Sequence, residues 1–368
     1  MTAPFTPLVA SLPATVPFVG PEAQERSRGR TFAARIGANE NVFGPSPKAI
    51  EAMRAEAANV WQYGDPTNFD LRKALAAHHA IPEDSIVIGE GVDALLGLTV
   101  RAFVAPGDKV VTSAGAYPTF NYHVAGFGGE LVTVPYAGDY EDPEGLIAKA
   151  REGGARLVYI ANPDNPMASW HDAARIQAMI DAVPDDCLLC LDEAYGEFAP
   201  DSALPQWDTT DSRVIRFRTF SKAYGLAGMR LGYAVSSPEV AGVFERVRNH
   251  FGVNRLAQAG ALAALADQDY LAQTRARVEQ ARQRIAGIAA DNGLTVLPSA
   301  TNFVAIDCGR DGDFARQVLA ALIARDVFVR MPGVAPLDRC IRISCAPEAE
   351  MELFARALPA ALAEARKA

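Results

Sequence analysis

The sequence predicts an α/β protein with two domains: a large three-layer α/β/α domain on a mainly parallel sheet, and a smaller α+β domain. Three observations support this prediction. The chain has 368 residues, more than a single hydrophobic core usually holds. From about residue 85, short β-branched runs alternate with amphipathic stretches, as in βαβ units. In the last third, a few separate strands follow a long helical stretch.

In the α/β part, strands are expected where short apolar runs end at turn residues. SIVIG is the first such run, and VDALLGLTVRAF at 92–103 has the apolar spacing of a helix. Because helices separate the strands, the sheet should be mainly parallel and covered on both faces. Strands are expected at 85–89, 108–113, 155–162, 187–194, 212–220 and 231–236.

The last third predicts a different arrangement. The region 262–290 is rich in Ala, Arg and Gln and carries charge throughout, so one long helix is expected there. Strands are expected at 301–307, 327–331 and 340–346, and a final helix at 347–366. The predicted organisation is an N-terminal arm at 1–35 that joins the smaller domain, a large domain at 36–258 and a small domain at 259–368.

Composition argues against several classes of protein. The net charge of −9 and the pI near 5.2 disfavour nucleic acid or an anionic membrane as partners, since both select basic surfaces. The N-terminal stretch MTAPFTPLVASLPATVPFVGPE has no basic start and is broken by prolines, so we expect neither a signal peptide nor a membrane span. Five cysteines without framework spacing indicate a reducing compartment, and a cytoplasmic location is expected.

Cysteine and histidine spacing gives no indication of a metal site. Cys187 and Cys190 are three residues apart in a predicted strand, so their thiols should face opposite sides of the sheet. We therefore expect core cysteines here rather than a metal-binding or redox pair. The five histidines show no metal-ligand spacing either.

A glycine-bearing turn, VIGEGVDALL, joins the first predicted strand to the helix at 92–103. Backbone N–H groups at a helix N-terminus bind phosphate, and glycine allows a close approach. A nicotinamide dinucleotide site would also need an acidic residue about 20 residues later. The next strand ends instead at Thr112 and Ser113. From these residues alone, the turn could be a phosphate-binding site or an ordinary turn between a strand and a helix.

Polar residues follow several of the later strands. Asp192 ends an apolar strand, Tyr195 falls in the same loop, and the loop NPDNP at 162–166 follows another strand. Such loops lie at the sheet edge where α/β proteins bind ligands. Taken singly, the aspartate could be a helix cap and NPDNP could be a plain loop.

Lys222 follows the strand at 212–220 within RTFSKAYGLAGMRLGY, so its amine should also emerge at that edge. Partial burial and a nearby cation such as Arg230 would lower its pKa and suit it to Schiff-base chemistry. The alternative is an ordinary lysine in a salt bridge. The order of turn, Asn loop, Asp-x-x-Tyr, Ser-Lys and Arg favours the first interpretation, because it matches what pyridoxal 5′-phosphate requires.

In these motifs the sequence resembles the fold-type I pyridoxal-phosphate aminotransferases of class I and II. It is most similar to the histidinol-phosphate aminotransferase group. The resemblance extends from ANENVFGP at 38–45 to IRIS at 341–344 and is most specific in LDEAYGEF and RTFSKAYGLAGMRLGY. It implies pyridoxal 5′-phosphate as cofactor and ping-pong transfer of an amino group from L-histidinol phosphate, or a related amino donor, to 2-oxoglutarate.

The resemblance also assigns roles to residues around the cofactor. Lys222 would bind it covalently and later transfer a proton, while Asp192 would pair with its pyridinium nitrogen. Tyr195 and Asn165 would hydrogen-bond its phenolic oxygen, and Phe120 would stack on its ring. Its phosphate would be held by Thr219, Ser221, Arg230 and the backbone amides near Val92 and Asp93.

Further residues would bind substrate or reach another subunit. Arg342 would receive the anionic group of the substrate, and Arg330 would bind a substrate phosphate. Asn39 would lie near the substrate entrance, together with Glu40. Tyr63 would reach the cofactor phosphate of a neighbouring subunit, which implies a homodimer.

One segment departs from the family pattern, and two other reactions stay open. The family commonly has Asn-Pro-Thr-Gly where this chain has Asn-Pro-Met-Ala at 165–168, and alanine is costly there if the backbone needs a positive φ. An aromatic or other L-amino acid could be the donor, or the enzyme could be a decarboxylase of the threonine-phosphate type. A ligand-sensing domain of a regulator is disfavoured by the acidic charge and by the lack of a DNA-binding segment.

Overall fold

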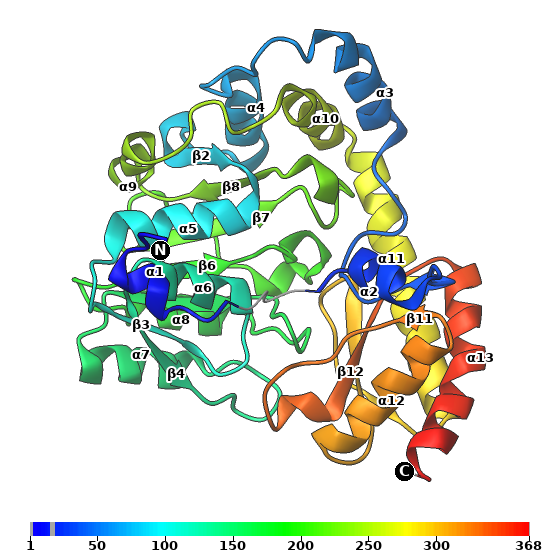
Figure 1. Ribbon diagram of the computed structural model, residues 1–368. Coiled ribbons are helices and arrows are strands. Elements are labelled where there is room, and N and C mark those ends of the chain that lie inside the picture. Colours follow the sequence, from blue (N-terminus) through cyan, green and yellow to red (C-terminus); the bar gives the residue numbers. More distant parts are fainter. Residues whose placement is uncertain (1–2, 15–18, 368) are drawn as a thin grey trace.

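A seven-stranded sheet forms the centre of the larger part of the protein in the computed structural model, which describes residues 3–14 and 19–367 (Figure 1). The strand order is β2-β8-β7-β6-β5-β3-β4. Strand β8 is antiparallel to both neighbours, and all other neighbouring strands are parallel. The strands are β2 (Ile86–Gly89), β3 (Lys109–Ser113), β4 (Glu130–Val134), β5 (Leu157–Ala161), β6 (Leu188–Asp192), β7 (Val214–Thr219) and β8 (Gly232–Val235).

These bounds confirm all six strands predicted for this region, and each strand is one or two residues shorter than predicted at one or both ends. Strand β4 was not predicted. It lies at the edge of the sheet, and Val134 is its one buried residue, so its sequence carries little of the apolar pattern that marks a central strand.

Helices cover both faces of this sheet, as predicted. One apolar cluster joins Leu95 of α5 and Val124 of α6 to Cys190, while a second joins Ile147 of α7 and Ile176 of α8 to the opposite face. Cys187 belongs to the second cluster, so the two thiols lie in separate cores as predicted. The helices are α5 (Gly91–Phe103), α6 (Pro118–Gly126), α7 (Pro143–Gly153), α8 (Ala173–Asp181) and α9 (Pro238–Val243), with α4 (Phe69–His79) near β2 and α3 (Pro47–Glu56) packed on α10 (Arg255–Ala266).

The C-terminal part contains a separate antiparallel sheet of order β12-β10-β9 with helices beside it (Figure 1). The predicted strands at 301–307 and 340–346 correspond to β10 (Phe303–Asp307) and β12 (Cys340–Ser344). The strand predicted at 327–331 is shorter, and the predicted final helix is α13. The remaining elements are β9 (Thr295–Val296), β11 (Val327–Phe328), α12 (Gly312–Ala324) and α13 (Glu348–Ala365).

The N-terminal arm contacts this C-terminal part. Strand β1 (Ala34–Arg35) pairs with β11 in parallel, and Arg28 of α2 (Pro21–Arg28) forms an ion pair with Asp326. A short helix, α1 (Pro7–Ser11), precedes them. Residues 1–2 and 15–18 of the predicted arm lie outside the described residues. The domain boundaries at 35/36 and 258/259 stay a proposal.

The single long helix expected over 262–290 is wrong. The structure has two helices there, α10 (Arg255–Ala266) and α11 (Gln268–Asp291), separated at Asp267, whose φ of −100° and ψ of 63° are not helical. The Asp267 carboxylate accepts hydrogen bonds from the Ser46 hydroxyl and, at 2.8 Å, from the Lys48 ammonium. No glycine or proline marks this break in the sequence, because the partners of Asp267 lie far away along the chain.

The Asn-Pro-Met-Ala segment connects the two parts of the structure. Ala168 has a φ of 65°, so this position is one that glycine would occupy without strain. Its carbonyl accepts a hydrogen bond from the Ala300 backbone at 2.9 Å. Met167 is fully buried against Ala305 and Leu337. The buried methionine side chain anchors the segment to the smaller sheet, which compensates for a backbone strain of about 1 kcal/mol.

No helix among the described residues is long and apolar enough to cross a membrane. Within the same residues, no group of three or more His, Cys, Asp or Glu side chains is arranged to hold a metal ion.

Candidate active site

Lys222 lies in the loop after β7, with its side chain partly buried. Its ammonium donates a hydrogen bond to the Asn39 carbonyl at 3.2 Å and lies 5.6 Å from the centre of the Tyr195 ring. Burial, together with the nearby cations Arg342 and Arg230, lowers the pKa of Lys222 to about 8. The amine is therefore neutral in about a tenth of the molecules at pH 7 and in about half at pH 8, and the neutral form is the nucleophile.

Asp192 ends β6 at the same sheet edge, and its carboxylate is almost completely buried. It accepts hydrogen bonds from the Tyr159 hydroxyl at 2.8 Å and from the Ala194 backbone at 3.0 Å. Burial raises its pKa to about 6. Within the described residues it forms no ion pair, so a buried cationic group beside it would be strongly stabilised.

Tyr159 of β5 is a site residue that the sequence did not reveal. Its ring is fully buried and stacks on Phe120, with the ring centres 4.5 Å apart. In LVYIA it is indistinguishable from a core aromatic, because its hydrogen bond to Asp192 depends on how β5 and β6 are paired.

Phe120, predicted to stack on the cofactor ring, has 0% exposed surface and packs in the core under α5 and on Tyr159. Its stacking role stays a prediction. Tyr117, which precedes α6, is only partly buried and lies close enough to Asp93 and Asp192 for their charges to help raise its pKa to about 12, mainly through burial. Tyr117 is therefore a second aromatic residue close to the site.

The start of α5 forms a place for an anion. Gly91 has a φ of 86°, and a Cβ there would lie 2.8 Å from a guanidinium nitrogen of Arg230. A Cβ on Gly232 would lie 2.9 Å from the Val92 backbone nitrogen. These two glycines let Arg230 and β8 approach the first amides of a 13-residue helix. Arg230 forms no ion pair within the described part of the chain.

Thr219, Ser221 and Asp93 also contribute to this anion site at the start of α5. The Thr219 hydroxyl accepts a hydrogen bond from the Ser221 backbone at 3.0 Å and donates one to the Leu231 carbonyl at 3.3 Å. Thr219 therefore fixes the turn that presents Ser221. The Asp93 carboxylate lies 3.2 Å from the His123 ring nitrogen. Only the backbone N–H of Asp93 can therefore donate a hydrogen bond to an anion at the start of α5.

Arg342 of β12 is partly buried and donates a hydrogen bond to the Asn165 side chain. Its Nε atom is buried without a partner in the described residues. Burial lowers its pKa. An unpaired, buried guanidinium atom next to Asn165 is suited to a carboxylate or phosphate group.

Arg330 lies next to Arg342, since the backbones of the two residues form a β-bridge. Burial and the charge of Arg342 lower the pKa of Arg330 to about 10, and its guanidinium donates to the Val19 carbonyl. Two adjacent arginines with lowered pKa values favour an anion between them, because the anion would offset their mutual repulsion.

Asn39 and Tyr195 lie between Lys222 and Arg342. Asn39 has a φ of 57°, and its side-chain amide donates to the Tyr195 hydroxyl at 3.2 Å. Its backbone nitrogen donates to the Ser344 hydroxyl at 3.0 Å. The neighbouring Glu40 is exposed, and its charge acts on Lys222.

Tyr63 is a predicted site residue that lies on the exposed surface of the described chain. It is 77% exposed and packs on the exposed Phe251, with the ring centres 4.8 Å apart. Trp61 and Val60 are also exposed beside it in the sequence. This apolar surface is available to another protein chain.

The described residues fit pyridoxal 5′-phosphate. The α5 start with Arg230 suits its phosphate, Asp192 lacks the cation that a protonated ring nitrogen would provide, and Lys222 is a partly neutral amine between them. All three lie at the carboxyl edge of the sheet.

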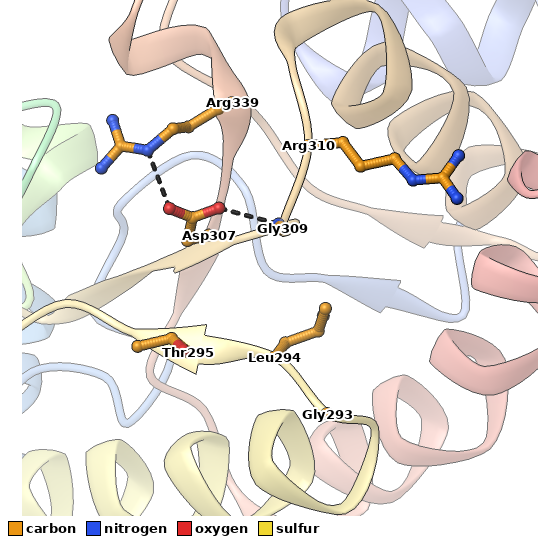
Figure 2. A pocket seen from close by; sticks show the side chains of 7 residues that line it. All are labelled: Gly293, Leu294, Thr295, Asp307, Gly309, Arg310 and Arg339. Carbon is orange, nitrogen blue, oxygen red and sulfur yellow. Dashed lines mark hydrogen bonds and ion pairs between the residues drawn. The ribbon is translucent and has the colours of Figure 1, made fainter.

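A surface hollow elsewhere contains none of the predicted site residues. It has a volume of about 340 Å³ and lies beside β9 and β10 (Figure 2). Arg339 is neutralised there by Asp307 at 2.8 Å and by Asp139 at 2.6 Å. Figure 2 shows the Arg310 side chain extending away from this ion pair.

The model of the family "Aminotransferase class I and II" matches residues 34–358. Histidinol-phosphate aminotransferase from Anaeromyxobacter sp. (strain Fw109-5) is 37% identical over 356 residues, which cover 96% of this chain and 97% of that protein. Histidinol-phosphate aminotransferase 2 from Pseudomonas aeruginosa is 38% identical over 332 residues, 89% of each. The crystal structure of histidinol-phosphate aminotransferase from Sinorhizobium meliloti with pyridoxal-5′-phosphate is 56% identical, with a TM-score of 0.96 over 99% of this chain and 98% of that one.

Proposed function

Because the chain belongs to the class I and II aminotransferases, we propose that its amino donor is L-histidinol phosphate and its acceptor is 2-oxoglutarate. The enzyme is a pyridoxal-phosphate-dependent transaminase of fold type I, similar to histidinol-phosphate aminotransferases. The observation that carries the choice of donor is the adjacent pair Arg330 and Arg342, whose lowered pKa values favour a phosphate-bearing substrate.

Pyridoxal 5′-phosphate, when bound, supplies an aldehyde carbon that condenses with amines and a ring that withdraws electrons from the substrate's α-carbon. Lys222 would hold that carbon through its amine and, once freed by the donor, would carry the proton that the donor's α-carbon loses. Asp192 would keep the ring nitrogen protonated, and the Tyr159 hydroxyl holds Asp192 in place. Tyr195 and Asn165 would hydrogen-bond the phenolic oxygen.

The remaining residues hold the two ends of the reactants. Arg230, Ser221 and the first amides of α5 bind the cofactor phosphate, and Thr219 orients Ser221. Arg342 binds an anionic group of the donor, next to Asn165.

A panel of amino donors tests this function. We expect L-histidinol phosphate to give a higher kcat/KM than phenylalanine, tyrosine, aspartate or arginine, with 2-oxoglutarate as acceptor and glutamate formation as the signal. Inactivity with histidinol phosphate would overturn the choice of donor. Release of CO₂ without any need for an oxo acid would instead favour the decarboxylase.

Replacing Arg342 with alanine is expected to raise the KM for the donor by about 10- to 100-fold and to change kcat less, because one charge-assisted contact to the donor is lost. Steady-state kinetics with varied donor measures both constants. Arg310→Ala is the matched control, since Arg310 lies in the hollow of Figure 2. Equal KM values in the two variants would contradict the role of Arg342.

We propose further that the active enzyme is a homodimer in which Tyr63 binds the cofactor phosphate of the partner. The exposed surface around Tyr63 and Phe251 supports this proposal, since a large apolar patch on a protein usually contacts another chain.

Co-expression of two inactive variants tests the shared site. Lys222→Ala and Tyr63→Ala chains should regain activity when mixed in one dimer, because one of its two sites then has both residues. Each variant expressed alone, at limiting cofactor, provides the control. If the mixed dimers are no more active than the parents, Tyr63 acts within its own chain or not at all.

A cytoplasmic location is also part of the proposal. All five cysteines are buried free thiols, as expected in a reducing compartment. Cell fractionation with antibodies against the enzyme would test it.

A further inference from the structure

Two buried carboxyl groups, those of Glu141 and Asp164, lie beside each other beneath the site. Each residue is 2% exposed, and the two carboxyl groups lie near enough for each to affect the pKa of the other. Two carboxyl groups so close together in a buried place are more stable sharing one proton than both ionised. Neither residue takes part in the chemistry described above.

The pair connects several strand ends. The Glu141 carboxyl accepts hydrogen bonds from the Ala161 backbone at 2.9 Å and from the Ser113 hydroxyl at 2.6 Å, at the ends of β5 and β3. The Asp164 carboxyl accepts from the Tyr136 hydroxyl and from the Met167 backbone, both at 3.0 Å. All four donors are neutral groups.

The charged groups around the pair do not neutralise two negative charges. Neither carboxyl forms an ion pair within the described residues. Of the surrounding charges, Arg342 favours the ionised form of Asp164, whereas Asp192 opposes ionisation of Glu141. The Nε2–H group of His171 donates to the Glu141 backbone carbonyl at 2.8 Å, and burial lowers the pKa of this histidine, which keeps it neutral.

Burial and mutual repulsion therefore keep a proton on the pair. Burial raises the pKa of Glu141 well above its ordinary value and raises that of Asp164 to about 7. Near neutral pH the pair holds one proton and one negative charge.

This proton lies one residue from the substrate site. Asp164 precedes Asn165 and accepts the hydrogen bond of Met167, so it holds the chain on both sides of Asn165. The Asn165 side chain in turn accepts a hydrogen bond from Arg342. We propose that Glu141 and Asp164 are a positioning pair that shares one proton, and that this proton holds the Asn165 loop in the orientation in which Arg342 binds the donor. The effect on the donor rests on the proposed function, whereas the shared proton does not.

Thermal unfolding across pH tests the shared proton. In Glu141→Gln, the amide replaces the protonated carboxyl and cannot ionise. Because folding raises the pKa of the pair, the wild type should lose stability as pH rises from the ordinary carboxyl range through about 7. We therefore compare the Tm of Glu141→Gln with that of the wild type at each pH. The Tm of the variant minus the Tm of the wild type should become more positive by at least about 2 °C between about pH 5 and about pH 8.5.

The matched control is Glu144→Gln, three residues further along the chain in the first turn of α7. Glu144 is exposed and paired with Arg175, which lowers its pKa to about 2, so it titrates below this range. Its Tm difference from wild type should stay constant with pH. A constant difference for Glu141→Gln as well would overturn the shared proton. Asp164→Asn provides a second test with the amide on the other partner, should Glu141→Gln fold poorly.

Donor kinetics test the positioning role. When the wild-type pair loses its proton, a second negative charge develops near Arg342. We expect the ratio of wild-type KM to Glu141→Gln KM for the donor to rise at least about threefold between about pH 6.5 and about pH 8.5. An unchanged ratio would overturn the positioning role. The thermal result does not depend on the donor, so failure of the proposed function can be told apart from failure of this proposal.

Discussion

Replacing Lys222 with alanine is expected to lower kcat by at least about 10³-fold, because the variant loses both the nucleophile and the group that carries the proton. The structure gives this amine the environment that both roles need. Burial and two arginines lower its pKa to about 8, and the Asn39 carbonyl 3.2 Å away orients it. The measurement is kcat with saturating donor, 2-oxoglutarate and added pyridoxal 5′-phosphate.

Lys222→Arg is the matched control for this change. It keeps a positive charge in the same place but has no amine that can be neutral near neutral pH. We expect it to be as inactive as Lys222→Ala. Activity within about tenfold of wild type in either variant would contradict the role of Lys222.

Replacing Asp192 with asparagine is expected to lower kcat by about 10²- to 10³-fold, because asparagine cannot neutralise a protonated ring nitrogen. The change keeps the shape of a buried side chain, so the loss should reflect charge rather than packing. In the wild type, the carboxylate has two hydrogen-bond donors and forms no ion pair among the described residues. Steady-state kcat at saturating cofactor measures the effect.

Tyr159→Phe is the matched control for Asp192, because it removes one hydrogen bond and leaves the charge. Its kcat should fall by about tenfold, the effect of one hydrogen bond to a charged group. Near-normal turnover in Asp192→Asn would refute the pairing with the ring nitrogen. A loss in Tyr159→Phe as large as that in Asp192→Asn would show that geometry, not charge, limits the reaction.

The main chemistry could be predicted from sequence because it lies at strand ends. Lys222 and Asp192 each follow an apolar run, and parallel strands bring such ends to one edge of the sheet. The resemblance then predicted Asn165 and Arg342, which the structure shows in contact. The order of strands and motifs along the chain was therefore enough to predict that these residues belong to one site.

Other features depend on contacts that the chain order does not encode. Tyr159 reads as a core aromatic, and its role depends on the pairing of β5 with β6. Glu141 reads as a surface carboxylate in a polar loop, yet it is buried beside Asp164. For Tyr117 and Phe120, two aromatics three residues apart, only the start of α6 decides which one is fully buried.

Borohydride reduction of the holoenzyme tests the central claim most directly, since it makes the link between enzyme and cofactor permanent. The account predicts that peptide mass spectrometry will find one pyridoxyl phosphate group per chain, on the peptide that contains Lys222. The same treatment of Lys222→Ala should leave no labelled peptide. A label on any other lysine, or none on the wild-type enzyme, would contradict the assignment of Lys222.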